Sequence, residues 1–338
     1  MSKNFIKKME KITEKFGRAA DNIKASMKKG ASKEQIKEYS ALEEAVLSAV
    51  NPQNLAIDLV EFETTREEII AFLVGFVTET ITEENLREKL LSALTNPDFL
   101  LEAYEGDDIL YGGECSPKKV VDKNGNEYWT TQQRVCVGKD LGDGRIKSTF
   151  LHIRDVLHEA AHLASQKYDP EWMNFDLDKN PFDRVKDHSV GEIESKFLEK
   201  VLCGYVLKNA SELCYNNQSF GVTEEELRRQ MVMLRNEDVR QFLARLRMGK
   251  MSGTKDYKQS FSHRYVIGEV CSRLLCEEYK QKPQDTMDLF SYYMSLNANI
   301  TIDQAVKILT EGKCTTYGDA MGAFKNFYTQ NAGEDEMI

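Results

Sequence analysis

The sequence contains little proline and no long hydrophobic run. Six prolines among 338 residues allow long, uninterrupted helices. No apolar run approaches the length of about 18 residues that a membrane span needs, and the N-terminus lacks the continuous apolar stretch of a signal peptide. Because 41% of the residues are hydrophobic and are spread along the chain, we expect a globular, cytoplasmic protein with a sizeable core.

The cysteines form no recognisable pattern. There are seven, an odd number, and no two have the spacing Cys-x-x-Cys. A disulfide framework or a cysteine zinc site requires regular spacing, so the sequence argues against both. We expect reduced thiols, most of them buried in helices.

Acidic side chains outnumber basic ones over most of the chain. The 45 basic and 55 acidic side chains give a net charge of −10, which argues against a nucleic-acid partner. Residues 1–30 differ, with nine Lys and Arg against three Asp and Glu. Apolar residues at helical spacing lie between these lysines, so we expect a helix packed on the body with a basic outer face. Docking of this helix on a membrane surface is the alternative.

Turn signals divide the chain into a helical region, a small sheet and a second helical region. Residues 1–110 are expected to form helices, with breaks at Lys29-Gly30, Asn51-Pro52 and Asn96-Pro97. From residue 148 the pattern is again helical almost to the end. We therefore predict a mainly α protein with an N-terminal helical region, residues 1–110, and a second domain, residues 111–338.

A strong hairpin signal lies between the two helical regions. Asn124-Gly125 favours a tight turn, and strand-like segments flank it at 118–122 and 127–131. Residues 134–137 add a third short strand, and residues 138–144 are expected to form a loop. The small sheet therefore comes immediately before the next helix.

The helix expected after this sheet carries the sequence His158-Glu159-Ala160-Ala161-His162. Residues four apart share a helix face, so His158 and His162 can both reach one metal ion. Glu159 lies beside that face, where it can take a proton from a water molecule on the metal. This is the pattern H-E-x-x-H, and it predicts a Zn²⁺ site. The alternative is a buried helix whose two histidines only form hydrogen bonds.

A catalytic zinc site needs a third protein ligand and an open position for water. Among the other histidines, His152 lies on a different face of the same helix. A carboxylate is the better candidate, and the acidic segment 187–199 supplies it. Within this segment Glu192 and Glu194 are rivals, because residues two apart lie about 200° apart around a helix and cannot both face the metal.

The segment Glu192-Ile193-Glu194-Ser195-Lys196-Phe197-Leu198-Glu199 resembles the signature E-(apolar)-P-S-Q-(apolar)-(apolar)-E of the thimet oligopeptidase and oligoendopeptidase F zinc peptidases. In that family the first Glu of the signature is the third zinc ligand, which corresponds to Glu192. The segment 111–115 resembles the family's Gly-rich edge strand, and the segment 265–270 resembles its Tyr-containing helix. The resemblance implies a zincin-like catalytic core within residues 111–338.

The resemblance also implies a reaction, namely hydrolysis of peptide bonds with Zn²⁺ as cofactor and a peptide or protein as substrate. Glu159 is expected to act as general base. Tyr265 is expected to donate a hydrogen bond to the oxyanion, with His263 and Tyr257 as alternates. The substrate is expected to add as a strand beside Gly112-Gly113.

Other polar residues near the motif have expected places. Asp155, and either Ser195 or Glu199, are candidates to hold the imidazoles through hydrogen bonds. Glu194 stands where the family has proline, and its neighbours on the helix face are apolar. We therefore expect Glu194 in solvent, at the first turn of its helix.

The sequence leaves two other functions open. One is a peptidase that attacks a single protein, as an effector secreted without a signal peptide does, and the basic N-terminus and the short N-terminal region favour it. The other is a helical interaction protein that keeps a zincin body without turnover. Metal content and peptide cleavage, measured together, distinguish the last function from the peptidases.

Overall fold

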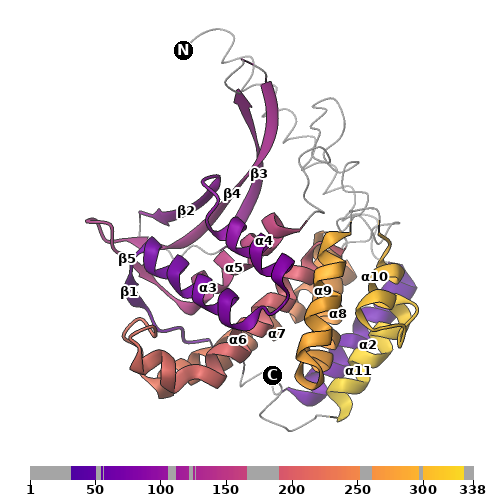
Figure 1. The fold of residues 1–338 in the computed structure, drawn as a ribbon. Helices are drawn as coiled ribbons and strands as arrows, with labels where there is room; N and C mark the ends of the chain where they lie inside the picture. The colour runs from indigo at the N-terminus through magenta and orange to yellow at the C-terminus, as the bar shows by residue number, and fades with distance from the viewer. Residues whose placement is uncertain are drawn as a thin grey trace.

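Helices make up most of the computed structural model, and five strands form one sheet beside them (Figure 1). The structure describes residues 32–50, 55, 57–105, 112–121, 125, 127–165, 190–251, 261–296 and 300–330. The prediction of a mainly α protein with one small sheet is therefore confirmed. Within these ranges no helix combines the length and the apolarity that crossing a membrane requires. The basic segment 1–30 lies outside them.

Five described elements precede residue 110, namely α2 (Lys33–Ala49), β1 (Phe62–Thr64), α3 (Arg66–Thr80), α4 (Glu84–Leu94) and β2 (Phe99–Tyr104). As expected, α2 ends before Asn51-Pro52 and α4 ends before Asn96-Pro97. α3 begins with a capping box, in which Thr65 and Glu68 satisfy backbone donors of the first turn. The expectation of helices throughout this region is wrong at β1 and β2.

The predicted hairpin is formed by β3 (Gly113–Val121) and β4 (Glu127–Asp140), which extend away from the helices (Figure 1). The two strands pair antiparallel, with Val121 opposite Glu127, and Gly125 has a φ of +83° in the turn between them. The hairpin prediction is therefore confirmed. The third strand expected at 134–137 is part of β4, and β5 (Ile146–Ser148) follows after a turn.

Three strands that the sequence did not reveal, β1, β2 and β5, complete the sheet around β4. The strand order is β1-β5-β4-β2, and β3 also pairs with β4. β1 pairs antiparallel with β5, so that Phe62 lies opposite Ser148. β2 pairs parallel with β4, so that Phe99 lies opposite Gln133. Each strand depends on a partner far along the chain, and a local pattern therefore did not predict it.

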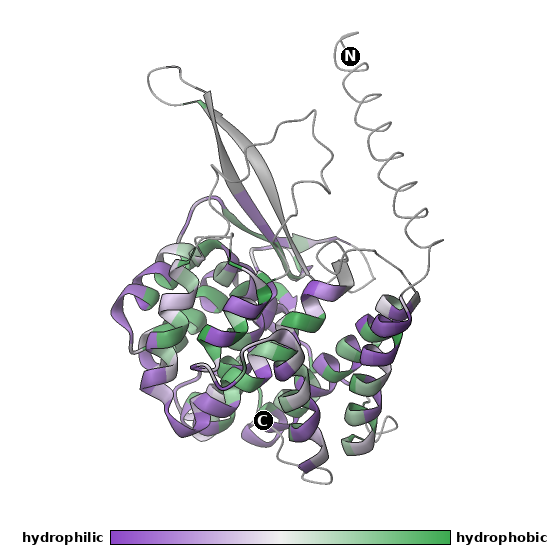
Figure 2. Cartoon of the chain, turned by 90° about the vertical axis from the view of Figure 1, so that its right-hand side faces the viewer, coloured by the Kyte–Doolittle hydropathy of each residue, from purple (hydrophilic) through white to green (hydrophobic). Residues whose placement is uncertain are grey.

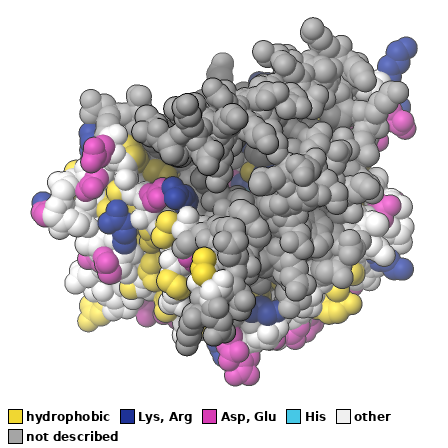
Figure 3. Space-filling view, turned by 90° about the horizontal axis from the view of Figure 1, so that it is seen from above, with side chains coloured by type: hydrophobic (Ala, Val, Ile, Leu, Met, Phe, Trp, Pro, Cys, Tyr) yellow, Lys and Arg dark blue, Asp and Glu magenta, His cyan; other side chains and the backbone are white. Residues whose placement is uncertain are grey.

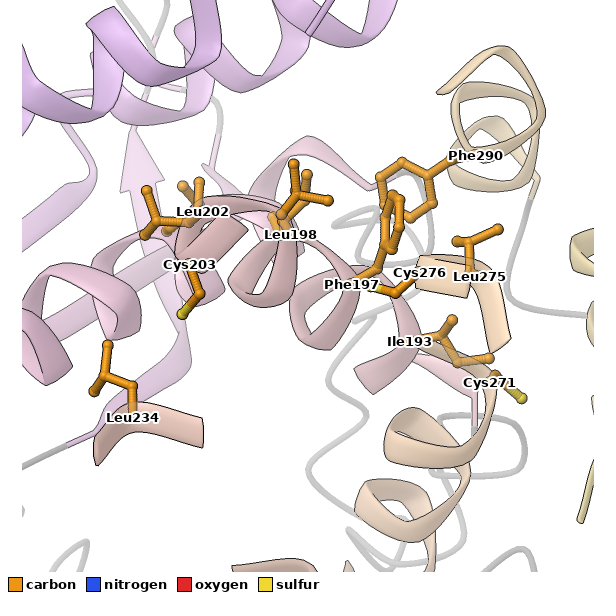
Figure 4. Close-up of a cluster of buried hydrophobic side chains, with 14 of the residues drawn as sticks. Ile193, Phe197, Leu198, Leu202, Cys203, Leu234, Cys271, Leu275, Cys276 and Phe290 are labelled. Carbon is orange, nitrogen blue, oxygen red and sulfur yellow. The ribbon is translucent and has the colours of Figure 1, made fainter. Parts of the chain in front are cut away.

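The rest of the described chain is helical, with α5 (Phe150–Ala164), α6 (Glu192–Tyr215), α7 (Glu224–Met251), α8 (Phe261–Gln281), α9 (Pro283–Ser295), α10 (Ile302–Leu309) and α11 (Tyr317–Gln330). α6 packs against α5, α7 and α8. Figure 4 shows Ile193 and Phe197 of α6 near Leu275 of α8 and Phe290 of α9, and the rings of Phe197 and Phe290 have centroids 4.6 Å apart. These contacts bury the first turns of α6.

Elements from both sides of residue 110 share one hydrophobic core. α2 packs against α7 and α11, and α4 packs against α5. In the helical body, many hydrophobic residues lie on the inner faces of the helices and hydrophilic residues on the outer faces (Figure 2). The six cysteines whose side chains are described are free thiols, four of them buried. The division into two domains at residue 110 stays a prediction.

The described surface carries mixed charge. In the face shown in Figure 3, Lys and Arg side chains lie beside Asp and Glu side chains along the margins. Among the exposed side chains of the described residues, Arg145 pairs with Glu63 at 2.6 Å and Arg228 pairs with Glu224 at 2.9 Å. Exposed ion pairs of this kind contribute little to stability. The expectation that nucleic acid is not a partner stays a prediction.

Candidate metal centre

Helix α5 carries the H-E-x-x-H motif and packs against β4, α4 and α6. Its first turn includes His152, whose Nδ1 accepts a hydrogen bond from the backbone N–H of Thr149 at 3.1 Å. His152 is therefore used at the start of the helix, which agrees with its expected place outside the metal site. Nearly two turns further, His158 is partly buried and His162 is buried, and both face α6.

The structure brings His158, His162 and Glu192 together in one cluster. The Nε2 atoms of the two imidazoles are 3.1 Å apart. The Oε2 atom of Glu192 lies 3.4 Å from Nε2 of His158 and 3.8 Å from Nε2 of His162. This oxygen is buried and accepts no hydrogen bond of normal geometry from the described residues. Three potential ligand atoms therefore converge at one buried point.

These distances fit a tetrahedral zinc ion. Zinc binds imidazole nitrogen and carboxylate oxygen at about 2.0–2.1 Å, so two ligand atoms of a tetrahedral site lie about 3.3 Å apart. The three separations in the cluster, 3.1, 3.4 and 3.8 Å, lie near this value. Two imidazoles and one carboxylate also match the donor set of a catalytic site, which leaves a fourth position for water.

Glu199 contacts the ring nitrogen of His158 that points away from the cluster, with Oε1 of Glu199 2.5 Å from Nδ1. Glu199 is itself buried, and Lys196 donates to its Oε2 at 2.9 Å. Burial opposes the charge of Glu199, but Lys196 and Arg154 hold the pKa of this carboxyl well below its usual range. A charged carboxylate on Nδ1 leaves the Nε2 lone pair for a metal ion. Of the residues proposed to hold the imidazoles, Glu199 therefore has this place.

A buried ion network supports Glu199. Arg154, on α5, donates to Asp238 of α7 at 2.8 Å and lies 3.6 Å from Glu199. Lys196 also lies 3.6 Å from Asp238. Burial acts against the charge of Arg154, but Asp238 and Glu199 raise its pKa above the ordinary value. Removing one member of such a network leaves an unpaired buried charge, so the network fixes α5, α6 and α7 relative to one another.

The electrostatics of the cluster favour a cation among its three ligand atoms. Burial alone lowers the pKa of His158, but Glu192 and Glu199 raise it well above its ordinary value. Burial alone raises the pKa of Glu192, but its contact with His158 and the charge of Arg264 hold it well below the usual range. A positive charge can be supplied to the cluster by a proton on an imidazole or by a divalent metal ion. Only the metal ion can bind all three ligand atoms at once.

Glu159 lies beside the cluster, as its position in the motif predicts. It is buried, and burial raises the pKa of its carboxyl above the ordinary value. The side-chain amide of Gln133, on β4, donates a hydrogen bond to its Oε2. Sequence reasoning missed Gln133. The alternation of Gln133, Val135 and Val137 with other residues could have indicated that Gln133 lies on the inner face of its strand. In the structure these three residues are buried, and the residues between them are more exposed.

The start of β3 lies directly on α5. A Cβ atom placed on Gly113 would lie 2.6 Å from Oε1 of Glu159, so only glycine lets the strand approach this closely. The backbone N–H of Gly112 donates to Asp155 at 3.0 Å, and Gly112 has a φ of +102°. Asp155 therefore holds the strand rather than an imidazole. Both predicted substrate-binding glycines are exposed and lie next to the motif helix.

The expected oxyanion donors have other contacts. His263 is buried between Tyr39 of α2, whose hydroxyl it contacts, and Tyr317 of α11. Tyr265 lies under the guanidinium of Arg245, 4.5 Å from its ring centroid. No contact of either residue with the metal cluster is found in the described part of the chain. Tyr257 lies outside the described residues, and the oxyanion donor stays a prediction.

Arg264 occupies the place beside the cluster that Tyr265 was expected to take. Its Nε lies 3.1 Å from Oε1 of Glu192, and it is near the hydroxyl of Tyr265 at 3.4 Å. Gly268, one turn further on α8, allows this approach, because a Cβ there would lie 2.9 Å from the backbone oxygen of Glu192. The sequence analysis considered only Tyr265 and His263 in this part of α8, so Arg264 was missed.

The expectation that Glu194 lies in solvent is wrong. It is in the first turn of α6 as expected, but its exposed fraction is 0%. The reason is that α6 begins inside the molecule, where every residue from 192 to 203 is buried, rather than on the surface as an amphipathic helix. Ser195, the other candidate on this helix, donates to the backbone oxygen of Glu192 at 3.3 Å.

The comparisons with known proteins add nothing to this geometry. No family model matches the chain, and neither a curated protein nor a solved structure does. The resemblance to the oligopeptidases therefore stays a prediction from the residues quoted above.

Proposed function

We propose that the protein is a zinc-dependent peptidase with a zincin-like catalytic core. The observation that carries this proposal is the convergence of Nε2 of His158, Nε2 of His162 and Oε2 of Glu192 at separations close to those of a tetrahedral zinc site. The neighbouring carboxylate of Glu159 supplies the second requirement of H-E-x-x-H chemistry.

A zinc ion held by His158, His162 and Glu192 would supply Lewis acidity, which would lower the pKa of a water molecule toward about 7. Glu159 would accept a proton from the attacking water and pass it to the leaving amine. Gln133 orients Glu159 through its hydrogen bond, and burial raises the pKa of Glu159, which suits a group that must both accept and release a proton. Glu199 fixes the ring of His158.

The proposed substrate is a peptide in extended conformation. β3 pairs with β4 along one edge, and in the described part of the sheet no strand occupies its other edge. A peptide added there would pair through its backbone, which requires no particular side chain. Because Gly113 lies on Glu159, the scissile bond of such a peptide would pass close to the general base.

Metal analysis and peptide digestion of the purified protein test the proposal together. We expect about one zinc ion per chain by elemental analysis and cleavage of a mixture of unstructured peptides that a chelator abolishes. Added zinc should restore cleavage. Protein that holds zinc and cleaves neither peptides nor unfolded proteins would contradict the proposal and favour the interaction protein. Protein without zinc would contradict the site itself.

Gly113→Ala tests whether the start of β3 positions the general base. The added methyl group would lie 2.6 Å from Oε1 of Glu159, so the carboxylate must move while the fold and the zinc remain. A displacement of about 1 Å can cost about 100-fold in turnover, and we expect a loss of this size with unchanged zinc content. Gly75→Ala on α3, where nothing lies within 4 Å of the new methyl, is the control. Equal turnover in the two variants would show that β3 does not constrain Glu159.

A further inference from the structure

A cavity of about 650 Å³ lies on a different part of α6 from the metal cluster. It is lined by the end of α3, the middle of α6 and α7, the C-terminal half of α8 and the start of α9. Its volume falls within the range of about 300–1,000 Å³ that small-molecule sites occupy. None of its lining residues belongs to the H-E-x-x-H motif or is Glu192. Figure 4 shows two of them, Cys203 on α6 and Cys276 on α8.

The wall of the cavity is basic, although the whole chain carries a net charge of −10. Five lining side chains are cationic and two are acidic. The two acidic groups already have partners, since Asp238 accepts a hydrogen bond from Arg154 at 2.8 Å and Glu79 accepts one from Tyr205 at 2.7 Å. Even with both carboxylates charged, the lining residues include three more cationic than acidic side chains.

Two of the cations are buried, and they share a carboxylate. Lys200 on α6 donates to Glu269 of α8 at 2.7 Å, and Arg273 lies 3.6 Å from the other oxygen of Glu269. All three side chains are at most 7% exposed. Asp238, the buried acid of the wall, also interacts with Arg154 and Lys196 of the neighbouring network, which includes Glu199. Taken together, the four cations Arg154, Lys196, Lys200 and Arg273 and the three carboxylates Glu199, Asp238 and Glu269 leave a net charge of +1 among these buried groups, where a net charge is costly unless an anion accompanies it.

The remaining surface of the cavity is largely apolar and adaptable. Tyr205 and Tyr279 contribute aromatic rings, and Met231 and Met287 contribute flexible thioethers. A ligand that suits this wall has a ring or chain as its body and one acidic group that reaches Lys200. We propose that the cavity binds a small organic anion of this kind, independently of the metal centre.

A pair of fluorescent probes tests the charge requirement. 8-Anilinonaphthalene-1-sulfonate has an apolar ring system with one sulfonate, and N-phenyl-1-naphthylamine has the same ring system without it. We expect saturable binding of one sulfonate probe per chain in a fluorescence titration. Hydrogen bonds to charged groups contribute about 1.5–3 kcal/mol, so the neutral probe should bind about tenfold or more weakly. Equal affinities would overturn the proposal that an anion is recognised.

A matched pair of glycine variants tests the location. Gly204 of α6 lines the cavity, and a Cβ atom there would have no neighbour within 4 Å. Gly204→Leu should therefore place a side chain in the cavity without a clash at its Cβ atom and weaken binding of the sulfonate probe about tenfold or more. Gly322 on α11 lies outside the cavity, and a Cβ atom there also has no neighbour within 4 Å, so the affinity of Gly322→Leu should equal that of the wild type. Wild-type affinity in Gly204→Leu would place the probe elsewhere and overturn the proposal.

Lys200→Met tests the anion site by a second route, which does not depend on the folding of Gly204→Leu. Removing this ammonium leaves Glu269 and Arg273 as a balanced pair, so the interior keeps no unpaired carboxylate. We expect its affinity for the sulfonate probe to fall toward that of the neutral probe, while the affinity for the neutral probe stays unchanged. Thermal unfolding followed by circular dichroism reports whether each variant is folded. A folded Lys200→Met protein with full preference for the sulfonate would contradict the assigned anion site.

Discussion

Glu159→Gln is expected to keep the zinc and lose peptide hydrolysis. The substitution preserves the volume of the side chain and leaves an oxygen that can accept the hydrogen bond from Gln133. It removes only the capacity to take a proton. General-base catalysis contributes about 10²- to 10⁴-fold, so turnover of an unstructured peptide should fall by at least the lower figure. Elemental analysis of the same preparation should give the wild-type zinc content.

Asp155→Asn provides the matched control for this variant. Asp155 stands one turn before the motif on α5, and its carboxylate accepts a hydrogen bond from Gly112, which an amide oxygen can also accept. We expect a much smaller loss of turnover, because this carboxylate binds the start of β3 and transfers no proton in the proposed reaction. Near wild-type turnover in Glu159→Gln would contradict the proposed mechanism. Loss of zinc in Glu159→Gln would instead mean that Glu159 is part of the metal site.

The sequence predicted the parts of the site that depend on local spacing. His158 and His162 are four residues apart, and any helix through this segment places them on one face. The same spacing puts Glu159 beside them. The hairpin of β3 and β4 also followed from a local signal, the Asn-Gly turn. Glu192 required more, because local spacing alone did not distinguish it from Glu194. The resemblance, together with the apolar neighbours of Glu194 on the helix face, favoured Glu192.

The parts that the sequence did not reveal depend on contacts between distant segments. Gln133 precedes Glu159 by 26 residues, and Arg154 precedes its partner Asp238 by 84. Nothing in the local pattern of either residue indicates its partner, because the packing of β4 and α7 on α5 decides it. Arg264 was missed for the same reason, since Gly268 brings α8 close to α6 only in the folded chain.

Glu194 illustrates how burial changes an argument from local sequence. Acidic residues in the first turn of a helix are usually exposed and interact with the helix dipole, and this favoured solvent for Glu194. The start of α6 is instead enclosed by α5, α8 and α9, so charged residues on every side of it are buried. Lys196 and Glu199 pair with each other, and Lys200 pairs with Glu269 across to α8.

This burial makes Glu192 and Glu194 a well-matched pair for testing the third ligand. Their exposed fractions are 1% and 0%, and both stand in the first turn of α6. Truncation to Ala removes the same atoms from equally buried positions, so both variants should lose stability by a similar amount, about 0.5–3 kcal/mol. A difference in zinc binding between them then reports ligation and not a general effect of the deletion.

Glu192→Ala should lose the zinc, because two imidazoles alone remain. Removing a partner outside the ligand shell costs about 10- to 100-fold in metal affinity, and removal of a ligand should exceed this. Glu194→Ala should bind zinc within a few-fold of the wild type. Competition with a chromogenic chelator measures both affinities, and a thermal melt without metal measures the shared loss of stability. If Glu194→Ala loses the metal and Glu192→Ala keeps it, the ligand lies two residues further along α6, and the convergence of Glu192 with His158 and His162 has another cause.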